Sequence, residues 1–264
     1  MFELTQQDRI LQIRLARPPV NALNRELLAG LAEQIENAPG RGAEAIVLAG
    51  NPGLFSAGLD IPELLRYDAA GLSGFLQTFF AALSALARAP LPVVAAFTGH
   101  SPAGGTVLGL FCDYRVMAAG DFKLGLNEVE VGLVVPPLVH RALARLLGGY
   151  RAERHLLDGR MIGAEQALAI GLVDELAPVE EVTARATAWC REHLALPRQA
   201  FLGTRRLARA NLVALFNDET TLGVETFVSE WFSAATQNTL QELIARLKAK
   251  REEPRAEEAK NATQ

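Results

Sequence analysis

Apolar and polar positions alternate near the start of the chain. Every second residue from Leu11 to Leu15 is apolar, and Phe2–Leu4 shows the same period. A two-residue period is typical of a strand with one buried face, so we expect strands over Phe2–Leu4 and Ile10–Leu15. Arg17-Pro18-Pro19 then ends the pairing, because proline lacks the backbone N–H that a strand ladder needs.

The pattern changes to a helical period after Asn24. Apolar residues recur three or four positions apart as far as Ile35, which predicts a helix to about Glu36 with one buried stripe. Asn24 suits the start of this helix, since its side chain can accept a hydrogen bond from a free backbone N–H.

Three further strands are expected, over Glu44–Ala49, Pro92–Phe97 and Asp113–Ala118, and the first of them is predicted to be buried. The first two lead into glycine-bearing loops, Gly50–Gly58 and Thr98–Gly105. The alternation of strand and helix predicts parallel strands, with a ligand site at their carboxyl ends.

From about Gly148 the pattern becomes almost entirely helical. The expected helices are Arg151–Leu157, Gly163–Ile170, Val179–Leu194, Arg198–Asn211 and Asn217–Ala234. The sequence therefore predicts an α/β core followed by a helical C-terminal region. The charged tail from Lys248 is expected to fray or to be disordered.

The composition narrows the functional classes. The 264 residues are half hydrophobic and carry a formal net charge of −4, so no nucleic-acid or anionic-membrane partner is expected. Cys112 and Cys190 form no metal or redox motif, and no secretory leader is visible, which favours a cytoplasmic location. We see no apolar run long enough to span a membrane. The histidines lack ligand spacing, so no metal is expected.

Two short loops carry the candidate chemistry. Ser56-Ala57-Gly58 offers small side chains at a turn, so a ligand could approach the backbone closely. Ala103-Gly104-Gly105-Thr106 opens a helix that is apolar all round and therefore buried. Its free N–H donors could receive an anionic oxygen. Either loop taken alone is also explained as a packing turn.

A third segment, Leu124–Leu133, places carboxylates among apolar residues. Such surroundings raise the pKa of a glutamate and suit it to proton abstraction near neutrality. Glu128 and Glu130 both fit this role, and the residues alone do not decide between them.

Together these motifs resemble those of the crotonase superfamily, also called the enoyl-CoA hydratase/isomerase family. The resemblance runs from about Leu11 to Leu207. It rests on Arg17-Pro18, Asn21-Ala22-Leu23, Phe55–Ile61, Pro102–Thr106, Cys112–Arg115, the Glu128 segment and Ala164–Leu176. It implies a crotonase-like α/β spiral of ββα units over residues 1–195, a helical trimerisation region over 196–250 and a tail over 251–264. The expected assembly is a homotrimer or hexamer.

The resemblance also implies an acyl-CoA thioester site. The backbone N–H groups of Leu59 and Gly104 would form an oxyanion hole, and Glu128 would be the catalytic base. The implied substrate-binding residues are Val20, Asn21, Ala22, Leu23, Ser56, Ala57, Gly58, Asp60, Gly105 and, near the nucleotide phosphates, Arg205. Coenzyme A would be part of the substrate, so no separate cofactor is expected.

One departure from the family pattern narrows the choice between the possible reactions. Hydratases of this superfamily have two active-site glutamates, and Val107 stands at the first of these positions. Adding water requires two such groups, whereas one base can move a proton from C2 to C4 of a 3-enoyl thioester. We therefore expect an isomerase similar to the mitochondrial-type Δ3,Δ2-enoyl-CoA isomerases of fatty-acid β-oxidation. The alternatives are a hydratase that uses Glu130 or Glu63, another crotonase reaction, and a non-catalytic acyl-CoA-binding protein.

Some residues receive structural interpretations. Asp60 is expected to cap a helix near Pro62, and Asp113 to satisfy backbone donors. Leu64–Gln77 is read as a loop that supplies a wall of the pocket. The aromatic residues Phe227, Trp231 and Phe232 are expected in the core, with a subunit contact or an acyl-chain wall as second possibility.

Overall fold

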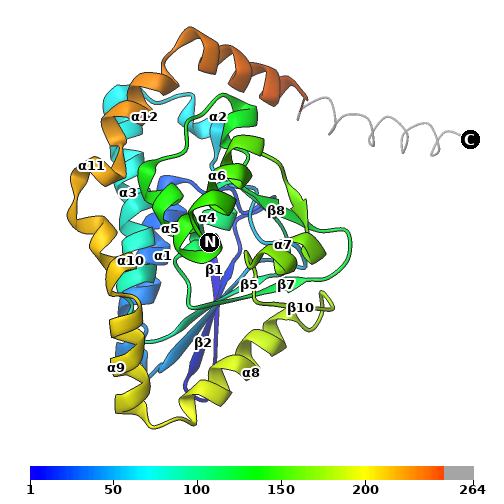
Figure 1. The fold of residues 1–264 in the computed structure, drawn as a ribbon, viewed down its shortest axis with the longest axis vertical. Coiled ribbons are helices and arrows are strands. Elements are labelled where there is room, and N and C mark those ends of the chain that lie inside the picture. Colours follow the sequence, from blue (N-terminus) through cyan, green and yellow to red (C-terminus); the bar gives the residue numbers. More distant parts are fainter. Residues whose placement is uncertain (247–264) are drawn as a thin grey trace, which may run out of the picture.

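Two β-sheets form the frame of the computed structural model, which describes residues 1–246 (Figure 1). The larger sheet has the order β1 (Phe2–Gln7), β2 (Ile10–Leu15), β3 (Ala45–Ala49), β5 (Val93–Phe97), β7 (Tyr114–Ala118) and β10 (Glu175–Ala177). The smaller has the order β4 (Gly53–Leu54), β6 (Gly99–Pro102), β8 (Lys123–Gly125) and β9 (Ile162–Gly163). Only β1–β2 and β8–β9 pair antiparallel among these strands, so the predicted parallel core is confirmed.

Helices cover the larger sheet and make up most of the chain after β8. Those of the first half are α1 (Arg25–Asn37), α2 (Ile61–Leu64), α3 (Ala69–Arg88) and α4 (Gly104–Leu110). Those of the second half are α5 (Pro137–Leu147), α6 (Gly149–Asp158), α7 (Ala164–Ile170), α8 (Val182–Leu194), α9 (Arg198–Ala208), α10 (Ala210–Ala214), α11 (Glu219–Leu222) and α12 (Val224–Trp231). The 3₁₀ turns are η1 (Pro39–Arg41), η2 (Glu128–Val131) and η3 (Leu215–Asn217), and residues 234–246 are also helical.

The central strands are apolar throughout because helices cover both of their faces. On one face, Ile46 and Leu48 belong to the core cluster that includes the buried stripes of α1 and α3. On the other face, Ala45 and Val47 pack in a second cluster with buried residues of α8. Figure 1 shows α1 and α3 on one side of the sheet and α8 on the other. Strands covered on both faces read as continuous hydrophobic runs, as the sequence of β3 and β5 does.

Several local predictions are confirmed by hydrogen bonds. Asn24 caps α1, because its Oδ1 accepts from the N–H of Leu27 at 2.9 Å. Asp60 caps α2, and Asp113 Oδ2 accepts from the backbone N–H of Val93 at 2.8 Å. These short polar side chains fix where helices and strands begin.

The predicted loop over Leu64–Gln77 is wrong, because α3 already begins at Ala69. Its cap is Asp68, which accepts from the N–H of Gly71 at 2.7 Å. By length and composition α3 could also cross a membrane, although no such apolar run was expected from the sequence. Half of its most apolar window is buried inside the fold, where α3 contacts α1 and α12, as expected of a core helix.

The C-terminal helices are shorter than predicted. Gly223 adopts a φ of +66°, which ends α11 and separates it from α12 within the predicted helix Asn217–Ala234. The predicted helix Arg198–Asn211 is likewise divided at Arg209, between α9 and α10. Helix α5 was not expected, although Pro137 at its first position is a known start signal. The predicted tail, 251–264, lies outside the described residues.

Candidate active site

A cavity of about 810 Å³ opens beside the two glycine loops. Leu59, Gly104 and Glu128 lie on its wall, and Arg17 and Asp60 are its other charged lining residues. Most of the remaining lining is apolar, and part of it comes from α3, α5, α12 and the last described helix. A concave, mainly apolar site of this size with a few convergent polar groups suits an organic ligand.

Hydrogen bonds to Asn21 hold the first glycine loop in shape. The Ser56 hydroxyl donates to the Asn21 carbonyl at 2.7 Å, and Asn21 Nδ2 donates to the Phe55 carbonyl at 3.1 Å. Ser56 Oγ also accepts from the N–H of Gly58 at 3.1 Å. Gly58 has a φ of +80°, which glycine adopts without steric cost. The loop is therefore fixed before any ligand arrives.

Leu59 follows this turn and pairs with Leu23 in an isolated parallel bridge. In the bridge, the N–H of Leu23 donates to the Gly58 carbonyl and the N–H of Asp60 donates to the Leu23 carbonyl. The N–H of Leu59 takes no part in it, and no acceptor for it is found within residues 1–246. Leu59 thus presents a free donor on the cavity wall.

The second glycine loop presents its donor at the start of α4. The N–H of Ala103 donates to the Gly125 carbonyl at 2.8 Å, which ties the loop to β8. Ala103 has a φ of +44° and a ψ of −116°, an uncommon conformation for a residue with a Cβ. Such strain persists only where the surroundings enforce it, and it is concentrated at functional sites. Gly104 comes next, and as the first residue of α4 it has an N–H without an intrahelical partner.

The two free N–H groups lie beside each other. A Cβ added to Gly104 would lie 3.5 Å from the nitrogen of Leu59, and one added to Gly58 would lie 3.5 Å from the nitrogen of Gly104. Two fixed donors this close can hold one oxygen as negative charge develops on it. The geometry fits an oxyanion hole.

Glu128 is the first residue of the turn η2 and is only 8% exposed. Its Oε2 atom has no hydrogen-bond partner among the described residues. Burial raises the pKa of Glu128 from 4.5 to about 7, and a backbone hydrogen bond opposes this rise. A carboxyl group with a pKa near neutrality can both remove and return a proton at physiological pH.

The alternative glutamates are not placed on the cavity wall. Glu130, two residues beyond Glu128, is exposed to solvent. Glu63 accepts from the Tyr67 hydroxyl at 2.8 Å and from Asn24 Nδ2 at 3.2 Å, so its carboxylate is already engaged. The structure therefore separates Glu128 from the candidates that the sequence left open.

Among the side chains near the oxyanion hole, only Glu128 offers a carboxylate that is not paired with another group in the described part of the chain. Asp60 is on the wall, but its Oδ2 pairs with Arg17 Nη2 at 2.7 Å. Val107 also lies on the wall, 2% exposed, and contributes no titratable group. Glu128 is thus the one unpaired carboxylate on this wall in the described part of the chain.

The sequence model of the family described as "Enoyl-CoA hydratase/isomerase" matches residues 5–254. The chain belongs to this family. The protein is therefore a crotonase-superfamily acyl-CoA enzyme, and its two mixed sheets with C-terminal helices form the crotonase α/β fold that the motifs implied.

The relatives of this chain include proteins named as isomerases and proteins named as hydratases. The chain is 32% identical over 241 residues to human mitochondrial enoyl-CoA delta isomerase 1, over 89% of this chain and 79% of the relative. It is 34% identical over 203 residues to a probable enoyl-CoA hydratase (echA17) of Mycobacterium avium, over 76% and 77%. Family membership thus leaves isomerisation and hydration both open.

The solved structures that match this chain also include both isomerases and hydratases. The crystal structure of human mitochondrial delta3-delta2-enoyl-CoA isomerase matches with a TM-score of 0.89 at 29% identity, over 94% of this chain and 98% of that chain. That of the enoyl-CoA hydratase EchA3 from Mycobacterium ulcerans matches with a TM-score of 0.78 at 31% identity, over 87% and 99%. The reaction must therefore be argued from the site of this chain.

The cavity is lined by some of the predicted substrate-binding residues. The predicted residues on its wall are Val20, Ala22, Ala57 and Asp60. Those that are buried and off the wall are Asn21, Leu23, Ser56, Gly58 and Gly105. The second group supports the loops, as the bonds of Asn21 and Ser56 show, instead of lining the cavity.

Arg205 is not on the cavity wall. Its guanidinium makes two hydrogen bonds of 2.8 Å to the Asp113 carboxylate and one of 2.7 Å to the Ala89 carbonyl. Because these partners occupy its donors, we assign Arg205 a structural role in place of the predicted phosphate contact. No local pattern in the sequence reveals this pairing, because the partners are 92 residues apart.

The cavity wall also contains residues whose contribution to it was not predicted, or was left undecided, from the sequence. Leu76 and Phe79 of α3 line the cavity. Leu76 lies in the segment Leu64–Gln77, which was expected to supply a wall, but it does so from a helix and not from a loop. Phe79 lies beyond that segment and was not expected. Asn127 also lines it, and its buried Oδ1 has no partner among the described residues. Phe227 is on the wall, whereas Trp231 is fully buried in the core.

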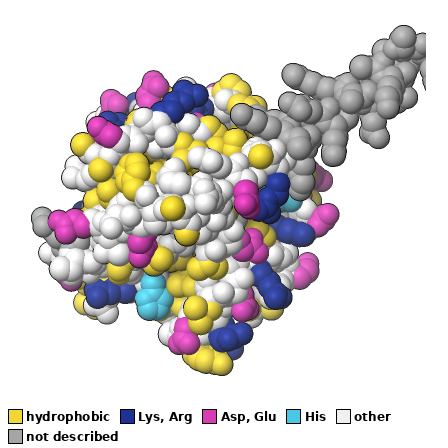
Figure 2. All heavy atoms as spheres, turned by 90° about the horizontal axis from the view of Figure 1, so that it is seen from above, with side chains coloured by type: hydrophobic (Ala, Val, Ile, Leu, Met, Phe, Trp, Pro, Cys, Tyr) yellow, Lys and Arg dark blue, Asp and Glu magenta, His cyan; other side chains and the backbone are white. Residues whose placement is uncertain are grey.

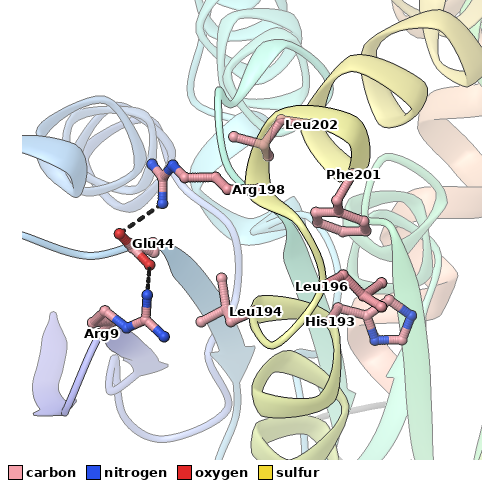
Figure 3. Close-up of a pocket in the computed structure, with 8 residues that line it drawn as sticks. All are labelled: Arg9, Glu44, His193, Leu194, Leu196, Arg198, Phe201 and Leu202. Carbon is pink, nitrogen blue, oxygen red and sulfur yellow. Dashed lines mark hydrogen bonds and ion pairs between the residues drawn. The ribbon is translucent and has the colours of Figure 1, made fainter.

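A second, much smaller hollow of about 30 Å³ lies where α8 and α9 meet (Figure 3). There the Glu44 carboxylate bridges two arginines, pairing with Arg198 at 2.6 Å and with Arg9. The hollow has room for about one water molecule. The ion pair between Glu44 and Arg198 links α9 to the start of β3. The hollow itself is too small for a CoA thioester.

Proposed function

We propose that this protein moves the double bond of a 3-enoyl-CoA to the 2 position. The thioester oxygen accepts hydrogen bonds from the N–H groups of Leu59 and Gly104. Glu128 removes a proton from C2, and the C–H electron pair passes into an enolate whose charge rests on that oxygen. The electrons then return as the C2=C3 bond, and the former C3=C4 pair takes the proton from Glu128 at C4.

The observation that carries this proposal is the single unpaired carboxylate on the cavity wall. Hydration needs one group to activate water and a proton for the neighbouring carbon. Val107 supplies neither, and Asp60 is paired with Arg17. Isomerisation needs one group that is first a base and then an acid, and the pKa of Glu128, raised to about 7, suits both steps.

The oxyanion hole and the general base together are expected to accelerate the reaction enough for an enzyme. Each donor of an oxyanion hole is typically worth about 10²–10³ in rate, and general base catalysis about 10²–10⁴. The similarity to the human isomerase supports the assignment, and the apolar cavity wall suits the acyl chain of a fatty-acid β-oxidation intermediate.

The test is a parallel incubation of the purified protein with 3-enoyl-CoA and with 2-enoyl-CoA, followed by product analysis. The proposal predicts 2-trans-enoyl-CoA from the first substrate and no hydrate from the second. A 3-hydroxyacyl-CoA product would instead support the hydratase alternative. Thioester binding without turnover of either substrate would favour an acyl-CoA-binding protein.

We also propose that the chain assembles as a homotrimer or hexamer. Large apolar side chains are exposed on the described chain, including Tyr150 at 73%, Leu157 at 64% and Val134 at 54%. Figure 2 shows hydrophobic side chains gathered between charged ones on one face of the molecule. Light scattering after size exclusion is expected to give three or six times the chain mass of 28.5 kDa, and a monomer would contradict the proposal.

A further inference from the structure

Thr106 lies on α4 two residues beyond Gly104 and is only 1% exposed. Its hydroxyl donates to the carbonyl of Ser101 in β6 and accepts from the N–H of Gly125 in β8 at 3.1 Å. One side chain thus joins the helix that carries Gly104 to both strands beneath it.

The strand β8 leads directly to Glu128. It pairs with β6 through Ser101↔Leu124 and Pro102↔Gly125 and ends at Gly125, three residues before the carboxylate. The carbonyl of Gly125 accepts from the N–H of Ala103 at 2.8 Å, while its N–H donates to Thr106. Both backbone groups of Gly125 are therefore held by residues that flank the oxyanion-hole donor Gly104, namely Ala103 before it and Thr106 after it.

We propose that Thr106 is a positioning residue that fixes the distance between the Gly104 N–H and the Glu128 carboxylate. The inference rests on the proposed function, because it concerns the spacing of the hole and the base. Thr106 is not on the cavity wall, so it acts through Gly125 and not by contact with the substrate.

The backbone around Gly125 leaves little freedom to compensate for a lost hydroxyl. Gly125 has a φ of +157°, and a Cβ there would lie 2.7 Å from the Arg160 carbonyl oxygen. Without Thr106 Oγ1, the buried N–H of Gly125 loses its acceptor, and the strand must move to find another. A displacement of about 1 Å between reacting groups can lower a rate about 10²-fold.

The matched control is Thr221, which is also 1% exposed. Its hydroxyl has two side-chain hydrogen bonds, from Arg141 at 2.8 Å and to Asp218 at 3.0 Å, and it is not on the cavity wall. Thr221→Val therefore removes a buried hydroxyl of the same kind away from the site. A loss of activity that merely followed lost stability would affect both valine variants.

The experiment compares Thr106→Val, Thr106→Ala, Thr106→Ser and Thr221→Val with the wild type. Their kcat and KM for 3-enoyl-CoA are measured, with kcat expressed per binding site titrated by a saturated acyl-CoA so that misfolded protein is not counted. We expect kcat to fall about 10- to 100-fold in the Val and Ala variants of Thr106, with KM changed by less than about threefold. Thr106→Ser keeps the hydroxyl and is expected to stay within about threefold of the wild-type kcat, as is Thr221→Val.

The inference is overturned if Thr106→Val or Thr106→Ala keeps the wild-type kcat, if Thr106→Ser is as slow as these, or if Thr221→Val loses as much. Exchange of the C2 protons of a saturated acyl-CoA in D₂O is measured in parallel, because it needs the hole and the base but no double bond. If the wild type exchanges these protons without isomerising 3-enoyl-CoA, the proposed function fails. The role of Thr106 is then judged by the same comparison of exchange rates.

Discussion

Replacing Glu128 by glutamine should make the protein more stable at alkaline pH. Burial raises the pKa of Glu128 from 4.5 to about 7, so the folded state favours its neutral form. This contribution to stability is fully present below about pH 4.5 and is lost progressively as the pH rises from there through about 7. The shift corresponds to about 3 kcal/mol, at 1.36 kcal/mol for each pKa unit. Glutamine stays neutral at every pH and avoids the cost of burying a charge.

The assay is urea unfolding of the wild type and of Glu128→Gln at pH 5 and at pH 8, at equal protein concentration because assembly also affects stability. The free energy of unfolding of the variant relative to the wild type should increase by about 2–3 kcal/mol between the two pH values. Glu130→Gln is the matched control, since Glu130 is an exposed carboxylate on the same turn and should show no such increase. An equal difference at both pH values would refute the raised pKa of Glu128.

Three further outcomes are expected. Gly104→Ala places a methyl group 3.1 Å from the side chains of Leu23 and Leu59 and beside the Leu59 N–H, so kcat should fall about 10²–10³-fold. Gly203→Ala on α9, where a Cβ meets nothing within 4 Å, should leave kcat unchanged; loss of activity in both variants would contradict the oxyanion hole. The kcat/KM for isomerisation should rise about tenfold for each pH unit below about 7 and level off above it, because Glu128 must be ionised to act; a flat profile from pH 5 to pH 8 would exclude it as the base. The Arg209 side chain is 5% exposed, pairs with Asp113 and donates to the Phe111 carbonyl at 2.7 Å. Arg209→Ala removes these contacts and should lower the free energy of unfolding by about 3–5 kcal/mol, as measured by urea titration.

The parts of the fold that depend on local signals could be predicted from the sequence. The strands β3 and β5 appear as continuous apolar runs, and the side chain of Asn24 marks the start of α1. The start of α3 was not expected, although its cap Asp68 is of the same kind, and Leu64–Gln77 was interpreted as a loop. The break at Gly223 depends on tertiary packing, since a Cβ there would lie 2.8 Å from Pro137 Cδ.

The candidate site could be predicted only as far as its backbone groups. Gly104 and Leu59 stand in recognisable motifs, so their positions were expected. Local sequence could not decide between Glu128 and Glu130, because the decision depends on which carboxylate the tertiary structure buries. The pairing of Arg205 with Asp113 is also a long-range contact that no local pattern reveals.

The most direct test of the account is the rate at which Glu128→Gln converts 3-enoyl-CoA to 2-trans-enoyl-CoA, compared with the wild type. A glutamine has the same shape but cannot accept the C2 proton, so the account predicts a fall in kcat of at least about 10²–10⁴. Binding of a saturated acyl-CoA by the variant, measured by calorimetry, should stay within about threefold of the wild type, since the hole of Leu59 and Gly104 remains intact. Full isomerase activity in a folded, thioester-binding Glu128→Gln protein would contradict the central claim that this carboxylate carries the proton.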